Sequence, residues 1–251
     1  MDMQVIYSFL LTTIAGLSTM IGSLLIFFTK NKSKSIIIAA LAFASAVMLT
    51  VSFTDLIPES INLLFNEYKK FPAIIILLIA INIGIIISFT IDKYLPDNAT
   101  NDGLYRVGII SMVAIIVHNI PEGMATFMAS SSNFSLGIVL TIAIALHNIP
   151  EGISISIPIY YSTNSKSKAF FYTFISGISE LFGAFITYLF LKPFINDRVM
   201  GILFGIIAGI MMHISIYELL PISLKYKKKK KTLFFYILGI TFILLNHFLF
   251  N

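Results

Sequence analysis

The sequence predicts an all-α integral membrane protein with eight transmembrane helices. Of its 251 residues 57% are hydrophobic and only 12% are charged, and the mean hydropathy is +0.92, whereas soluble domains carry about 25% charged residues. Eight apolar stretches reach the length of about 20 residues that a membrane-spanning helix needs. Short polar connections separate them, so we expect one polytopic transmembrane domain over residues 1–251.

The expected spans follow one another closely along the chain. They cover residues 4–28, 36–58, 72–91, 107–129, 136–160, 169–191, 199–222 and 232–250. The N-terminus has no basic region and no small-residue cleavage site, so we expect the first stretch to be a retained helix and not a signal peptide. The chain has no cysteine, which excludes a disulfide framework and a thiolate metal site.

Basic residues are distributed unevenly between the seven loops. The first, third, fifth and seventh loops hold 13 Lys and Arg, and the other three hold 4. Because basic loops favour the cytoplasm, we expect a multi-pass protein of the cell (inner) membrane with both termini extracytoplasmic. The net charge of +5 is then explained by the orientation of the chain in the membrane, and no nucleic-acid partner is expected. The Lys-rich run 225–231 is interpreted as an anchor of this kind, with a lipid-binding or regulatory patch as the alternative.

Two pairs of similar segments indicate an internal duplication. "AGLSTMIGS" (15–23) matches "SGISELFGA" (176–184), and "AVMLTVSFTDLIP" (46–58) matches "GIMMHISIYELLP" (209–221). Helices 1–3 would therefore correspond to helices 6–8. Five spans separate equivalent helices, so the second copy would be inverted, which is typical of transporters with a substrate site near the bilayer midplane. The alternative is a chance match of apolar segments.

Six acidic residues lie in or at the end of the expected spans: Asp55, Glu59, Glu122, Glu151, Glu180 and Glu218. No Lys or Arg lies well inside a span. Because a charged group at the bilayer centre costs about 2.5–3.5 kcal/mol, such acids must be protonated or neutralised by a cation. With histidines beside them, they indicate a bound metal ion, protons or both.

Three polar groups are expected at the same depth. His118, His147 and Glu180 each lie 11 residues after the start of an apolar run. A helix rises about 1.5 Å per residue, so each would lie about 16 Å deep, which is the middle of a hydrocarbon core about 30 Å thick.

The segment "HNIPEG" occurs twice, at 118–123 and 147–152. His118 and Glu122 are four residues apart and Asn119 and Glu122 three, so all three share a helix face. The second copy repeats this pattern with His147, Asn148 and Glu151. A carboxylate has two oxygens and can bridge two ions, and imidazole with carboxylate suits zinc, iron, manganese or cobalt better than magnesium or calcium. A polar cluster that only locks helices together is the alternative.

These residues resemble the ZIP (Zrt/Irt-like) divalent metal transporters, and within them the bacterial zinc-uptake branch of the ZupT type. The resemblance extends over essentially the whole chain. It rests on both "HNIPEG" copies, "SFTDLIPE" in the second span, "SGISE" in the sixth and "YELLP" in the seventh. The doubled motif in consecutive middle spans is highly specific.

The resemblance implies a binuclear metal site. One metal would take His118, Glu122, His147 and Glu151, and the second would take Asn119, Glu122, Asn148, Glu151 and Glu180. It also implies import of Zn²⁺ into the cytoplasm without ATP, no enzyme activity and no organic cofactor. Fe²⁺, Mn²⁺, Co²⁺ and Cd²⁺ are further candidate substrates. The lipid bilayer and a second copy, forming a homodimer, are the other implied partners, and helices 1, 4, 5 and 6 would move against the rest as an elevator.

The sequence departs from the family pattern in two places. Relatives often have proline after the sixth-span glutamate, but Leu181 follows Glu180 here, which leaves the reach of Glu180 open. Many relatives also have a His-rich loop between the third and fourth spans, whereas loop 92–106 has no histidine.

Other polar residues lie near the ends of spans. We expect Asp55, with Glu59, to attract cations at the outer mouth, and Glu218 with His213 to serve the inner exit; caps of helix ends are the alternative. His247 is expected to be interfacial.

Two further functions are alternatives to metal transport. One is an intramembrane metalloenzyme, for which no H-E-x-x-H exists. The other is a proton-coupled transporter of another cation, for which no aromatic cage is evident.

Overall fold

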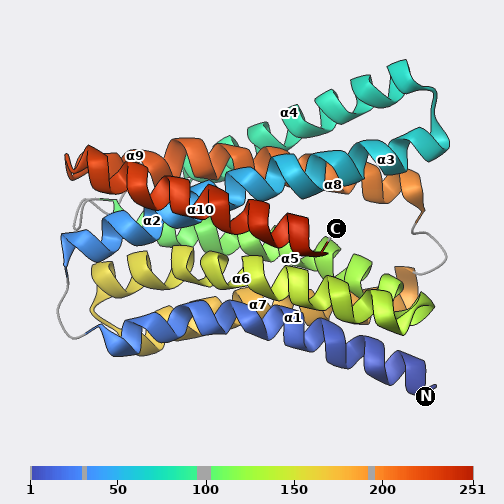
Figure 1. Ribbon diagram of the computed structural model, residues 1–251, viewed down its shortest axis with the longest axis horizontal. Coiled ribbons are helices and arrows are strands. Elements are labelled where there is room, and N and C mark those ends of the chain that lie inside the picture. The colour runs from blue at the N-terminus through green and yellow to red at the C-terminus, as the bar shows by residue number, and fades with distance from the viewer. Residues whose placement is uncertain (1, 30–32, 95–102, 192–195, 251) are drawn as a thin grey trace.

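A computed structural model describes residues 2–29, 33–94, 103–191 and 196–250, and these contain helices and no strand (Figure 1). All eight expected spans are present as helices long and apolar enough to cross a membrane. The single-helix spans are α1 (Met3–Phe28), α4 (Lys70–Tyr94), α5 (Leu104–Ser132), α6 (Phe134–Thr163) and α10 (Lys229–Phe250). The sixth span is α7 (Lys166–Ile186), continued by the π-helical turn η2 (Thr187–Leu191).

The second and seventh spans are each interrupted by a π-helical turn. The second consists of α2 (Lys34–Val51), η1 (Ser52–Leu56) and α3 (Ile57–Glu67), and the seventh of α8 (Asp197–His213), η3 (Ile214–Leu219) and α9 (Leu220–Lys225). Proline follows both turns, at Pro58 and Pro221. Because proline has no N–H for an ordinary helical hydrogen bond, it favours such a local irregularity just before it.

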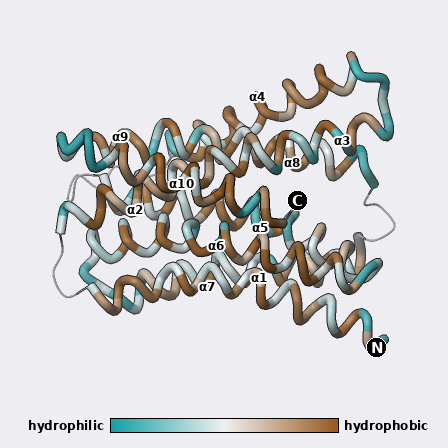
Figure 2. Tube along the Cα trace, in the orientation of Figure 1, coloured by the Kyte–Doolittle hydropathy of each residue, from teal (hydrophilic) through white to brown (hydrophobic). Residues whose placement is uncertain are grey.

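The second span is longer than the sequence predicts. The expected end at residue 58 falls nine residues short of Glu67. The apolar run stops at Glu59, but the helix continues with one face against the protein, where Ser60 and Leu64 are fully buried. A hydropathy criterion misses this part because its other face is polar. Figure 2 shows that hydrophilic residues gather at the ends of the bundle, around α9 and around the α3–α4 connection.

The helices pack into two groups. The first contains α1, α5, α6 and α7, which pack closely on one another; in the second, α4 packs on α8 and α10 on α2. Figure 1 shows α1, α6 and α7 in the lower half of the view and α3, α4, α8 and α9 in the upper half. Both chain ends lie toward the right of that view, opposite α9. The first group corresponds to helices 1, 4, 5 and 6 of the sequence analysis.

Glycines allow the backbones of the first group to approach closely. A Cβ added to Gly16 on α1 or to Gly177 on α7 would overlap the carbonyl oxygen of the other glycine. A Cβ on Gly123 would overlap the backbone of Glu180. Small residues at such crossings are typical of membrane helix packing. At Gly123 the absence of a side chain lets α5 pack directly against α7.

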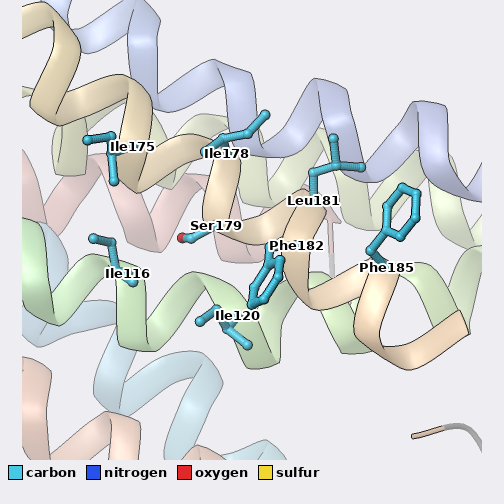
Figure 3. A pocket seen from close by; sticks show the side chains of 8 residues that line it. All are labelled: Ile116, Ile120, Ile175, Ile178, Ser179, Leu181, Phe182 and Phe185. Atoms are coloured by element: carbon cyan, nitrogen blue, oxygen red, sulfur yellow. The ribbon is translucent and has the colours of Figure 1, made fainter. Parts of the chain in front are cut away.

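A shallow groove of about 470 Å³ lies between α5 and α7 (Figure 3). The figure shows Ile116 and Ile120 from α5 facing isoleucine, leucine and phenylalanine side chains of α7. Ser179 is its one polar lining residue. This lining offers no charged or imidazole ligand, so the groove is unsuited to metal ions.

Candidate metal centre

A tight turn brings the two "HNIPEG" copies to the same level. Asn133 is both the last cap of α5 and the first cap of α6, and its side chain accepts a hydrogen bond from the Leu136 N–H at 3.1 Å. Asn is a preferred residue at a helix start for this reason. His118 lies 15 residues before Asn133 and His147 lies 14 after it. Two antiparallel helices joined at Asn133 therefore place both histidines side by side.

The seven residues predicted to bind metal are all buried, with exposures from 0% to 8%. They are His118, Asn119 and Glu122 on α5, His147, Asn148 and Glu151 on α6, and Glu180 on α7.

Glu122 lies between the two histidines. Its Oε1 is 2.9 Å from His147 Nε2, and its Oε2 is 3.5 Å from His118 Nε2. One ligand atom from each of these three residues lies within 4.8 Å of the others. Zinc binds nitrogen and oxygen ligands at about 2.0–2.2 Å, so a group of this size can close around one ion after small side-chain movements.

Glu151 approaches the same nitrogen of His118 as Glu122 does. Its Oε1 is 3.7 Å from His118 Nε2, and neither carboxylate oxygen has a hydrogen-bond partner. The second carboxylate is thus close to the first histidine but is not part of the tight group around Glu122.

The two asparagines present their carbonyl oxygens as donor atoms. Asn148 donates its amide to Glu180 Oε2 at 3.0 Å and to the Ala15 carbonyl at 3.1 Å. Asn119 donates to the Ser176 carbonyl at 3.0 Å. Both Oδ1 atoms are buried without a partner. Glu180 therefore reaches the site although Leu181 follows it, because α7 passes directly beside Gly123.

Unpartnered buried polar atoms are concentrated here. Most such atoms in proteins have a hydrogen-bond partner. In the described part of the chain, eight atoms of the predicted site have none: His118 Nδ1 and Nε2, Asn119 Oδ1, Glu122 Oε2, Asn148 Oδ1, Glu151 Oε1 and Oε2, and Glu180 Oε1. One imidazole, two amide oxygens and four carboxylate oxygens make a donor set that fits a divalent transition metal. A cluster that merely joins helices would satisfy its own hydrogen bonds.

A cavity of about 560 Å³ leads from Glu122 and His147 toward one end of the bundle. Its polar lining consists of Thr54, Asp55, Glu59, Asn62, Glu122, His147, Asn246 and His247. The structure thus brings the predicted mouth residues Asp55 and Glu59 into the same cavity as the central group. Asp55 lies in η1, within the second span and not at a helix end.

The predicted exit residues lie in a separate cluster. His213 Nδ1 is 2.9 Å from Ser88 Oγ, and its ring stacks on Tyr217. Glu218 lies in η3, also within its span rather than at a helix end, and interacts with Asp92 and Arg106. Neither His213 nor Glu218 lines the cavity described above.

One functional candidate was missed by the sequence analysis. His247 on α10 is 2.8 Å from Asp55 Oδ1, and with Asn246 it lines the cavity. The partial exposure of His247 is consistent with the interfacial position that the sequence predicts. The sequence did not predict the contact of His247 with Asp55. The sequence feature that could have indicated a functional role is the polar pair Asn246–His247 within the apolar run of the last span.

Comparisons with known proteins agree with this geometry. The family model described as ZIP Zinc transporter matches residues 96–247. The chain is 37% identical to a zinc transporter ZupT of Campylobacter jejuni, over 97% of this chain and 96% of that protein. A ZupT of Streptococcus mutans is 38% identical over the full length of both chains, and one of Chlorobium limicola is 42% identical over 86% and 87%. The chain is therefore a multi-pass membrane protein that belongs to the ZIP zinc transporter family, a family of transporters and not of enzymes.

Proposed function

We propose that this protein carries divalent transition-metal ions, zinc foremost, across the membrane into the cytoplasm without ATP. The observation that carries the proposal is the position of Glu122 between His118 and His147, in the interior of eight apolar helices. The relatives named zinc transporters give it independent support. Fe²⁺, Mn²⁺, Co²⁺ and Cd²⁺ remain candidate substrates, because the same donor types serve them.

The ligand sets we propose form a binuclear centre. His118, Glu122, His147 and Glu151 hold one ion. The second ion takes the amide and carboxylate oxygens of Asn119, Glu122, Asn148, Glu151 and Glu180. The unpartnered oxygens of Glu122, Glu151 and Glu180 support this division. Glu122 and Glu151 would each bridge the two ions.

The route we propose runs from Asp55 and Glu59 to the centre and then to His213 and Glu218. The cavity supports its first half, since it reaches from Asp55 to Glu122 and His147. The excess of Lys and Arg in alternate loops supports an orientation with α9 in the cytoplasm and both termini outside. The mouth then faces the exterior, because His247 beside Asp55 belongs to the C-terminal part of α10.

We also propose that the first three and last three spans form an inverted repeat. Equivalent positions make equivalent contacts: Gly16 meets Gly177, and Thr19 abuts Gly152 as Glu180 abuts Gly123. The π-helical turns η1 and η3 contain the paired residues Asp55 and Glu218. Such symmetry allows the two helix groups to exchange an outward cavity for an inward one. The homodimer implied by the family stays a prediction, testable by mass measurement in detergent.

Radiometal uptake into proteoliposomes tests this function. Native protein should take up zinc down its gradient with no ATP present, and Glu122→Ala should remove this uptake. Glu67→Gln is the matched control, because Glu67 lies outside the cavity and contacts Arg198 at 3.4 Å. If zinc, iron, manganese and cobalt all stay outside vesicles that contain native, correctly inserted protein, the proposal is wrong.

A further inference from the structure

The mouth of the cavity holds a second group of metal-binding side chains, separate from the central seven. We propose that Asp55, Asn246 and His247, which we call the mouth site, bind one transition-metal ion before it moves to the central site. The mouth site would thereby favour zinc-like ions over Mg²⁺ and Ca²⁺. This inference rests on the proposed transport function and adds a selection step to it.

The carboxylate of Asp55 is held in a fixed orientation. His247 Nδ1 donates to Oδ1 at 2.8 Å, and Thr54 Oγ1 donates to Oδ2 at 3.0 Å. The π-helical turn η1 carries Asp55 on the cavity wall, and Pro58 follows that turn. Two helices far apart in the sequence thus contribute an imidazole and a carboxylate to one point.

Asn246 supplies a third donor atom. Its side chain lines the cavity and its residue is only 8% exposed. The amide nitrogen donates to the Ala143 carbonyl at 3.2 Å, while Oδ1 is buried without a hydrogen-bond partner. A buried carbonyl oxygen without a hydrogen-bond partner is energetically unfavourable. An ion at the mouth would satisfy this oxygen.

The mouth site repeats the donor types of the centre. Both combine imidazole nitrogen, carboxylate oxygen and asparagine amide oxygen, and the cavity that the mouth site lines reaches Glu122 and His147 of the centre. Imidazole favours zinc-like ions, whereas magnesium and calcium prefer oxygen ligands alone. An incoming Zn²⁺ would replace the proton that His247 shares with Asp55, and this proton would pass to water. Three protein ligands would leave coordination positions to water, and ligand exchange at these positions would let the ion move on.

A purely structural contact between α10 and the second span is the alternative. His247→Asn separates the two, because an Asn amide can still donate to Asp55 but provides no imidazole. Asp197→Asn is the control, since Asp197 is an acid at the same end that contacts Asn66 at 2.7 Å and does not line the cavity.

The first test measures Co²⁺ binding in a background that lacks both proposed bridging ligands of the central site, Glu122→Ala with Glu151→Ala. We expect one residual Co²⁺ per chain, and His247→Asn should weaken it at least about tenfold, the size of effect seen around metal ligands. Asp197→Asn should leave it unchanged. Absence of residual Co²⁺ binding, or binding that is insensitive to His247→Asn, would overturn the proposal. If the background variant does not fold, the same comparison counts ions in the native chain, which should bind one more than His247→Asn.

The second test measures transport in the otherwise native chain. His247→Asn should raise the KM for zinc about fivefold with little change in kcat, which indicates a lost binding step. It should also make uptake more sensitive to competing Ca²⁺. Unchanged KM and unchanged Ca²⁺ competition would overturn the mouth site while leaving the central function intact. Loss of uptake in Glu122→Ala reports on the central function alone.

Discussion

The two "HNIPEG" copies have identical sequences but different surroundings. Glu122, in the first copy, contacts both histidines and lines the cavity. Glu151, in the second copy, is 1% exposed, has no hydrogen-bond partner and does not line the cavity. Each copy thus contributes one residue to the cavity, Glu122 from the first and His147 from the second, and of the two glutamates only Glu122 lines it.

The neighbouring helices cause this difference. Asn148 meets the carboxylate of Glu180, but Asn119 meets only the backbone of Ser176. In the first copy Gly123 packs on Glu180, and in the second Gly152 packs on Thr19. Helix α7 thus contributes a third acid, Glu180, whereas α1 contributes the hydroxyl of Thr19. The two identical motifs therefore differ in their surroundings because different residues face them.

The largest expected effect separates the two glutamates. Glu122→Ala should reduce zinc uptake at least about 100-fold and Glu151→Ala about tenfold, because only Glu122 contacts both histidines. Initial uptake rates at equal amounts of inserted protein measure the difference. A larger loss in Glu151→Ala than in Glu122→Ala would mean that Glu151, and not Glu122, contributes more to zinc transport.

The next effect concerns pH. Histidine and carboxylate ligands must lose protons to bind metal, so zinc affinity should fall by about tenfold per pH unit for each proton displaced as pH decreases. Calorimetry in buffers of different ionisation enthalpy counts those protons. Glu122→Ala should release fewer protons than the native chain. An affinity independent of pH would show that binding does not displace protons from these ligands.

A smaller difference is expected between the asparagines. Asn148→Ala should weaken the second bound zinc about fivefold and Asn119→Ala about twofold, because only Asn148 also orients Glu180. Equilibrium dialysis of zinc against each variant measures this. Equal effects would mean that the Asn148–Glu180 contact does not contribute to the second ion.

The smallest effect is expected at Thr19, the counterpart of Glu180 in the proposed repeat. Thr19→Val keeps the shape of the side chain and removes a buried hydroxyl that has no hydrogen-bond partner and that we assign no metal, so uptake should change by less than about twofold. Glu180→Gln, measured in parallel, should lower the zinc stoichiometry. A large loss in Thr19→Val would indicate a ligand that the account omits.

Much of the fold was predictable because membrane spans follow from local composition. Counting residues along apolar runs also predicted one level for His118, His147 and Glu180, and helices α5, α6 and α7 do meet there, since His147 contacts Glu122 and Asn148 contacts Glu180. The continuation of the second span to Glu67 was missed because polar residues on one face end the apolar run. The His247–Asp55 contact joins residues 192 positions apart, so it depends on how α10 packs on the second span. The unequal surroundings of Glu122 and Glu151 likewise arise from tertiary packing, since their sequences are the same.

Anomalous scattering from zinc-loaded protein tests the central claim most directly. We expect a zinc peak at about 2.0–2.2 Å from His118 Nε2, His147 Nε2 and an oxygen of Glu122. A second peak should lie beside Asn148 and Glu180. Zinc bound elsewhere, with no peak between the two histidines in a protein that still transports zinc, would contradict it.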